Sequence, residues 1–172
     1  MRDSWHEMLE NRILRSIPLL VSVVWLMISF IPLKSEISAN ARPMIGLVCV
    51  YFWVIYRPDL FNLWSVFVLG VISDVLSIAP LGIFLFMYLV MYLTVTNLIK
   101  YINDKTFEIM WSGLIILLPV VMLSGWLLMS IYYAQFIPIK GLFFSYLLSI
   151  ALYPLISGVN AMIVNRFLQD DD

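Results

Sequence analysis

The segment GVISDVLSIAPLG, residues 70–82, places Asp74 inside a run that is otherwise apolar enough for a lipid bilayer. Similar apolar runs recur along the whole chain, and about 20 such residues let a helix cross a hydrocarbon core of about 30 Å. A charged side chain within such a run is expensive, so it faces protein rather than lipid. The segment therefore predicts a membrane helix whose carboxylate finds a partner inside the protein.

The composition supports the same fold class. The chain has 172 residues, of which 63% are hydrophobic and 12% are charged, and its mean hydropathy is +0.98. A soluble domain carries about a quarter charged residues, so the charges here are too few to cover a soluble surface. The net charge of −1 argues against nucleic-acid binding. With one cysteine and one histidine, the chain lacks the usual ligand sets for metals, and we predict no metal and no cofactor.

We predict an all-α polytopic membrane protein with six transmembrane helices. Residues 1–15 are expected to form an amphipathic interfacial helix, residues 16–168 a single six-helix membrane domain, and residues 169–172 an acidic tail. The expected spans are about 16–33, 44–56, 60–78, 83–99, 110–133 and 142–167. The second span is the shortest, so it must either thin the bilayer or extend through the polar residues 37–43.

Lysine and arginine predict the orientation, because cytoplasmic loops carry an excess of them. If both termini are cytoplasmic, that side receives seven of these residues: Arg2, Arg12, Arg15, Arg57, Lys100, Lys105 and Arg166. The other side receives Lys34, Arg42 and Lys140. The bias predicts a multi-pass protein with both termini in the cytoplasm.

Asp74 lies about 21 Å beyond the cytoplasmic start of its helix at 1.5 Å per residue, in the outer third of the membrane. Gly70, Asp74 and Ser77 share one helix face, which is small and polar. Arg42, at the outer end of the antiparallel second span, lies near the expected height of Asp74, and we predict that the two interact directly or through water. Three roles stay open for Asp74: a structural carboxylate, a docking point for another membrane protein, and a proton or substrate relay.

Nothing in the sequence indicates catalysis. It contains no Gly-rich phosphate loop, no nucleophile beside a base and no carboxylate pair, so we predict that the protein is not an enzyme. Asn160, within PLISGVNAMIVN (residues 154–165), lies at membrane depth and is expected to form a hydrogen bond between helices.

An ordered set of short motifs lies between residues 50 and 90. A Trp precedes Arg-Pro by a few positions, G-x-x-x-D follows about a dozen residues later, and a Pro-Leu-Gly turn comes next. The residues are Trp53, Arg57, Pro58, Gly70, Asp74, Pro80, Leu81 and Gly82. The set resembles the family of MreD, the rod shape-determining membrane protein of bacteria. Ile78 departs from the pattern, since the family often has Gly there.

The resemblance implies a six-helix fold like that of the substrate-binding subunits of energy-coupling-factor transporters, in the bacterial inner membrane. It implies a non-enzymatic scaffold of the elongation complex, or elongasome, that supports rod cell shape and lateral peptidoglycan synthesis. The implied partners are MreC by direct contact and, through the complex, MreB, RodA and the elongation transpeptidase. The motif residues thereby become candidates for partner docking or for structural roles. The alternative function is a small-molecule-binding membrane transport subunit, which predicts an outward-open cavity with converging polar groups.

Overall fold

The computed structural model describes residues 3–30, 42–77, 79–101 and 106–167, and all regular structure in these ranges is helical. The elements are α1 (Asp3–Ser29), α2 (Ile45–Tyr56), α3 (Leu63–Leu76), α4 (Ile83–Leu98), the short 3-10 helix η2 (Ile99–Tyr101), α5 (Phe107–Tyr132) and α6 (Lys140–Phe167). The predicted all-α class is confirmed. The helices α2 to α6 each coincide closely with one predicted apolar run, whereas α1 begins well before the first run. The breaks between the runs carry the polar, Pro and Gly residues that interrupt helices.

α1 is one continuous helix, with no break at the predicted boundary between residues 15 and 16. It passes through Pro18, and the Ser22 hydroxyl donates a hydrogen bond to the Pro18 carbonyl at 2.7 Å. The segment predicted as a separate interfacial helix is therefore the first half of a longer helix. Its side chains, like the predicted acidic tail at residues 169–172, lie outside the described residues.

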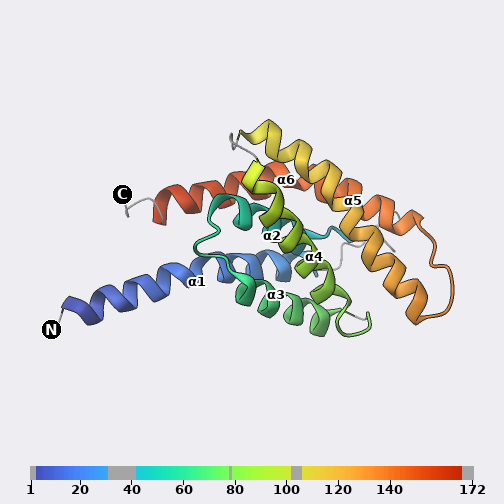
Figure 1. The fold of residues 1–172 in the computed structure, drawn as a ribbon, viewed down its shortest axis with the longest axis horizontal. Coiled ribbons are helices and arrows are strands. Elements are labelled where there is room, and N and C mark those ends of the chain that lie inside the picture. Colours follow the sequence, from blue (N-terminus) through green and yellow to red (C-terminus); the bar gives the residue numbers. More distant parts are fainter. Residues whose placement is uncertain (1–2, 31–41, 78, 102–105, 168–172) are drawn as a thin grey trace.

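α2 forms the centre of the protein. Eleven of its 12 residues are buried, and it packs against all five other α-helices. Figure 1 shows it enclosed by its neighbours. A helix that is apolar all round suits either a protein interior or a membrane span. The contacts of α2 with every other α-helix show that here it lies in the interior of the bundle.

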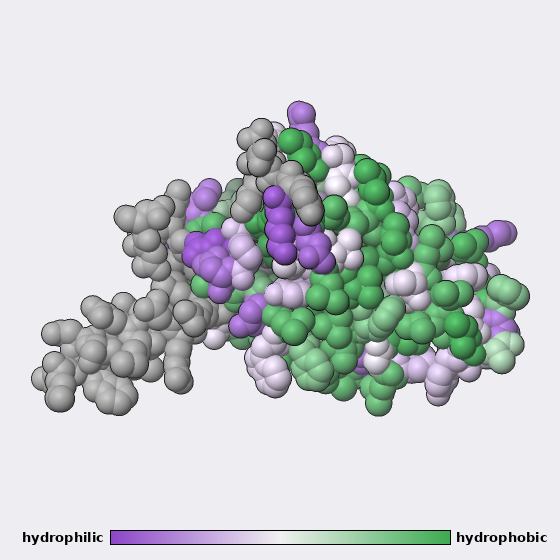
Figure 2. All heavy atoms as spheres, in the orientation of Figure 1, coloured by the Kyte–Doolittle hydropathy of each residue, from purple (hydrophilic) through white to green (hydrophobic). Residues whose placement is uncertain are grey.

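Successive helices run back and forth along the long axis of the molecule (Figure 1). The start of α1, the α2–α3 turn and the end of α6 lie towards one end, whereas the α3–α4 and α5–α6 turns lie towards the other. Figure 2 shows a broad apolar surface, with hydrophilic side chains gathered near the end that holds the α2–α3 turn. Within the described residues, α5 and α6, of 26 and 28 residues, are the two helices long and apolar enough to cross a membrane. α3 and α4 are shorter, at 14 and 16 residues.

Candidate functional site

The Asp74 carboxylate caps the N-terminus of α4. It lies near the end of α3, its residue is only 4% exposed, and the donors that it accepts hydrogen bonds from are all backbone amides. Oδ2 accepts hydrogen bonds from the N–H groups of Gly82 at 3.0 Å and Leu85 at 3.2 Å, and Oδ1 accepts one from Phe84 at 2.9 Å. A carboxylate at this place also favourably meets the positive end of the helix dipole.

The α3–α4 turn explains why α4 needs a cap from another helix. The first N–H groups of any helix lack partners within it. Residues 79–82, Ala-Pro-Leu-Gly, have no side chain that could accept these hydrogen bonds. Gly82 has φ of +100°, a left-handed conformation that glycine adopts without a Cβ penalty. The Ile83 N–H donates a hydrogen bond to the Pro80 carbonyl at 3.4 Å. Asp74 satisfies the amides on either side, so the carboxylate and the Pro-Leu-Gly turn form one structural unit.

The same face of α3 holds α4 close. A Cβ atom built on Gly70 would lie 2.8 Å from the Leu85 Cα atom, which is nearer than real Cβ atoms approach a backbone. One turn further along α3, the Ser73 and Tyr88 hydroxyls are joined by a hydrogen bond of 2.9 Å. Small residues let helix backbones approach each other in this way. The α3–α4 interface is therefore set by Gly70 and is pinned at its end by Asp74.

The predicted small polar face of Gly70, Asp74 and Ser77 is therefore used inside the protein. Ser77 follows α3, is half-buried, and its hydroxyl donates a hydrogen bond to the Asp74 main-chain carbonyl at 3.0 Å. Of the three roles left open for Asp74, the geometry supports the structural one, because both carboxylate oxygens already have partners.

The predicted direct ion pair between Arg42 and Asp74 is not formed. Among the described residues the recorded ion pair is Arg57–Asp59, at 3.1 Å. Arg42 is exposed, and its guanidinium lies over the Phe30 ring, 5.8 Å from the ring centroid. The amides of α4 complement the Asp74 charge, so no cation is required beside it. A link through water stays a prediction.

The motif residues at the α2–α3 turn divide between the interior and the surface. Trp53 is fully buried in α2 and packs edge-to-face against Phe52, with ring centroids 5.3 Å apart. Arg57 ends α2, and its N–H donates to the Trp53 carbonyl at 2.9 Å while its side chain pairs with Asp59. Pro58 is exposed. This part of the motif therefore combines a core residue with a surface turn.

Asn160 connects the first and last helices. It is fully buried in α6, and its Oδ1 accepts a hydrogen bond from Trp25 Nε1 in α1 at 3.1 Å. This is an interhelical bond of the kind predicted from the sequence. The Cys49 thiol in α2 is also buried. Within the described residues, no three His, Cys, Asp or Glu side chains are grouped so that they could hold a metal ion.

Sequence reasoning missed a set of serines that holds the chain entering α2. Ser145 Oγ accepts a hydrogen bond from the Arg42 N–H at 3.1 Å, and Ser149 Oγ accepts one from the Met44 N–H at 2.8 Å. Ser29 donates to the Pro43 carbonyl at 2.8 Å. The spacing of Ser145 and Ser149, one helical turn apart on α6, was the available signal, but it does not identify a partner more than 100 residues away.

Comparison with known proteins assigns the chain to a family. The family model described as rod shape-determining protein MreD matches residues 11–163, which is most of the chain. No curated protein and no solved structure matches this chain. The family is one of structural, shape-determining membrane proteins that are not known as enzymes, and the matched range includes the whole motif from Trp53 to Gly82. The chain therefore belongs to the family of the rod shape-determining protein MreD.

Proposed function

We propose that this protein is a six-span scaffold of the bacterial inner membrane that binds MreC and supports lateral peptidoglycan synthesis by the elongation complex. The observation that carries the proposal is the family match over residues 11–163. The back-and-forth course of six helices, with the start of α1 and the end of α6 towards the same end, fits an even number of crossings (Figure 1). The excess of Lys and Arg expected on that side favours cytoplasmic termini.

The filled interior favours a scaffold over a small-molecule transport subunit. Transport sites need a cavity with converging polar groups, and drug-sized ligands occupy about 300–1,000 Å³. The centre of this bundle is instead occupied by α2, whose residues Leu47, Val48 and Trp53 are fully buried. Interior side chains fill this centre, and the cavity where the end of α1 meets the start of α2 has a volume of only about 230 Å³.

The exposed face of α3 is the surface that we propose for MreC. Since Gly70 and Asp74 face α4, a partner has to use the other side of the helix. There Trp64 and Val75 are 71% and 70% exposed, and Phe67 and Val71 lie between them. The Trp64 and Phe67 rings stack at 5.7 Å, which makes a rigid aromatic contact of the type that dominates binding interfaces.

Co-purification in mild detergent tests this proposal. The full-length chain is expected to capture MreC from the same cells, and Trp64→Ala with Phe67→Ala is expected to reduce capture without lowering membrane abundance. Matched control substitutions are Ile116→Ala with Val120→Ala on α5, where both side chains are also exposed. Loss of capture only in the α5 variant would contradict the α3 surface. Failure of the abundant wild-type protein to capture MreC would contradict the proposed function.

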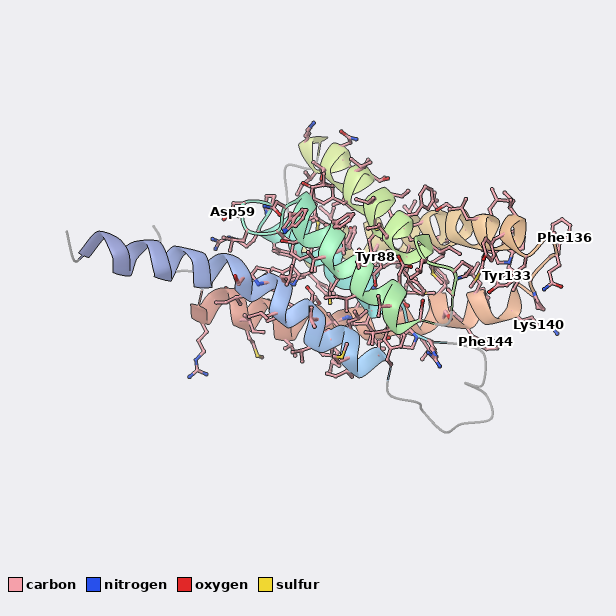
Figure 3. All side chains as sticks on the ribbon, turned by 90° about the horizontal axis from the view of Figure 1, so that it is seen from below. Asp59, Tyr88, Tyr133, Phe136, Lys140 and Phe144 are labelled. Carbon is pink, nitrogen blue, oxygen red and sulfur yellow. The ribbon has the colours of Figure 1, made fainter. Side chains whose placement is uncertain are left out.

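Cysteine labelling tests the orientation separately. Asp59 and Lys140 are exposed and lie at opposite ends of the molecule (Figure 3), and the native Cys49 is buried. In whole cells whose outer membrane is permeable to the reagent, an impermeant maleimide should label Lys140→Cys. It should label Asp59→Cys only after the inner membrane is opened. The reverse pattern would contradict cytoplasmic termini.

A further inference from the structure

A cavity of about 230 Å³ lies where the end of α1, the start of α2 and the start of α4 meet α6. Ser77, Phe84 and Tyr88 line it on the side of α3 and α4, and Ser145 lines it on the side of α6. In Figure 3 Tyr88 lies well inside the bundle, away from Lys140 at the α5–α6 turn. The cavity therefore lies beside the capped start of α4 and is separate from the surface proposed for MreC.

Arg42 supplies a positive charge at the rim of this cavity. Its main chain is held by the hydrogen bond from its N–H to Ser145 Oγ, and its guanidinium rests over Phe30, another lining residue. Among the described residues no carboxylate pairs with Arg42, and both oxygens of Asp74 are occupied by amides of α4. The guanidinium is thus positioned by its surroundings, and no carboxylate of the described residues neutralises its charge.

The remaining lining combines apolar side chains with backbone N–H groups at the start of α2 that have no side-chain acceptor. Leu26, Ile45 and Phe84 give hydrocarbon surface. Ile45 and Gly46 belong to the first turn of α2, which has no side-chain cap. The amides of such a turn add a partial positive charge to that of Arg42. The volume exceeds the roughly 150 Å³ of an engineered cavity that holds benzene, so it can receive a short length of an acyl chain.

We propose that this cavity binds the headgroup of an anionic membrane phospholipid, one with no compensating cation, with the phosphate at Arg42 and the adjoining part of the acyl chain against Leu26 and Phe84. Arginine pairs with phosphate through charge-assisted hydrogen bonds. An anionic amphiphile satisfies both the charge and the apolar wall, whereas a free anion satisfies only the charge. In the proposed topology the ligand comes from the outer leaflet. The inference depends on the proposed membrane orientation but not on MreC binding.

Native mass spectrometry of the purified full-length protein tests the proposal. Wild type, Arg42→Gln and Lys140→Gln are compared in mixed micelles containing phosphatidylglycerol or phosphatidylcholine with the same acyl chains. Both substitutions remove one exposed positive charge, but Lys140 lies outside the cavity. A hydrogen bond to a charged group contributes about 1.5–3 kcal/mol, so the wild type should retain phosphatidylglycerol at least about tenfold better than Arg42→Gln. Lys140→Gln should bind like wild type.

Three results would overturn the proposal. The first is equal retention of both lipids by the wild type, and the second is an equal loss of phosphatidylglycerol in the Arg42 and Lys140 variants. The third is complete displacement of the lipid by equimolar inorganic phosphate, which would assign the site to a free anion.

Arg42→Lys keeps the charge and should restore part of the binding. Ser77→Phe, which narrows the cavity and leaves Arg42 in place, should also lower retention, and the thermal unfolding of each variant is measured alongside.

Discussion

Removing the Asp74 carboxylate should destabilise the protein without touching any exposed surface. Asp74→Ala leaves the N–H groups of Gly82, Phe84 and Leu85 without their acceptor. Losing an N-cap side chain costs about 0.5–2 kcal/mol, and a hydrogen bond to a charged group contributes about 1.5–3 kcal/mol. Because the turn is partly exposed and water can replace some of the bonds, we expect a loss of about 3–4 kcal/mol in the free energy of unfolding.

Asp74→Asn separates charge from shape. It keeps one acceptor oxygen but turns an amide N–H₂ group towards one side of the cap, so we expect an intermediate loss of about 1–2 kcal/mol. Asp74→Glu should also destabilise, because the extra methylene displaces the carboxylate from the three amides. Ser77→Ala is the control on the same turn, since its hydroxyl only donates back to the Asp74 carbonyl. It should cost less than about 1 kcal/mol.

The assay is unfolding of the purified variants by SDS titration in mixed micelles, with amide hydrogen exchange followed at the start of α4. From most to least stable, the expected order is wild type, Ser77→Ala, Asp74→Asn and Asp74→Ala. Amide exchange at residues 82–85 should become faster in the same order. If Asp74→Ala unfolded like the wild type but failed to capture MreC, the capping argument would be refuted. The carboxylate would then belong to a docking surface.

Three further predictions concern helix packing and the interior. Gly70→Ala should cost about 1–3 kcal/mol in the same titration, because its Cβ would meet the α4 backbone. Gly158→Ala, with open space around its Cβ position, should be neutral or stabilising, and equal effects of the two would refute the close approach. Asn160→Ala and Trp25→Phe should each lower the free energy of unfolding by about 1 kcal/mol. Because both remove the same hydrogen bond, the double variant should lose less than the sum of the two single losses. A loss equal to that sum would contradict the bond. The Cys49 thiol should resist maleimide in native vesicles and react after SDS unfolding, whereas rapid native labelling would contradict its burial.

The partner of Asp74 shows where sequence reasoning reached its limit. Depth along the helix suggested Arg42, because a buried carboxylate ordinarily pairs with a cation. The sequence contained a better signal, which is that residues 79–82 offer α4 no side-chain cap while a carboxylate stands eight residues before Gly82. Backbone donors are invisible in a search for charged partners. The direct ion pair was predicted because only charged side chains were considered as partners, whereas the actual partners are backbone amides.

The role of α2 shows a second limit. Its apolar residues predicted a membrane span, and hydropathy cannot distinguish a helix surrounded by lipid from one surrounded by other helices, because both environments exclude polar side chains. Only the contacts of α2 with every other α-helix show that it is the core. The helix α1 likewise runs without a break across residue 15, where the composition changes from polar to apolar, because such a change does not interrupt backbone hydrogen bonds.

By itself, the sequence determined the helical class, the six apolar segments with their approximate ends, and the family, whose motif lies between Trp53 and Gly82. These properties depend on local composition, on turn residues and on their order along the chain. The tertiary structure decided which helix is central and that the Asp74 carboxylate binds the start of α4. It also decided that Arg42 lies at the rim of a cavity and not in an ion pair with Asp74. Those outcomes depend on which backbones approach each other in space, and hydrogen bonds to backbone amides leave no trace in the identity of the residues that donate them.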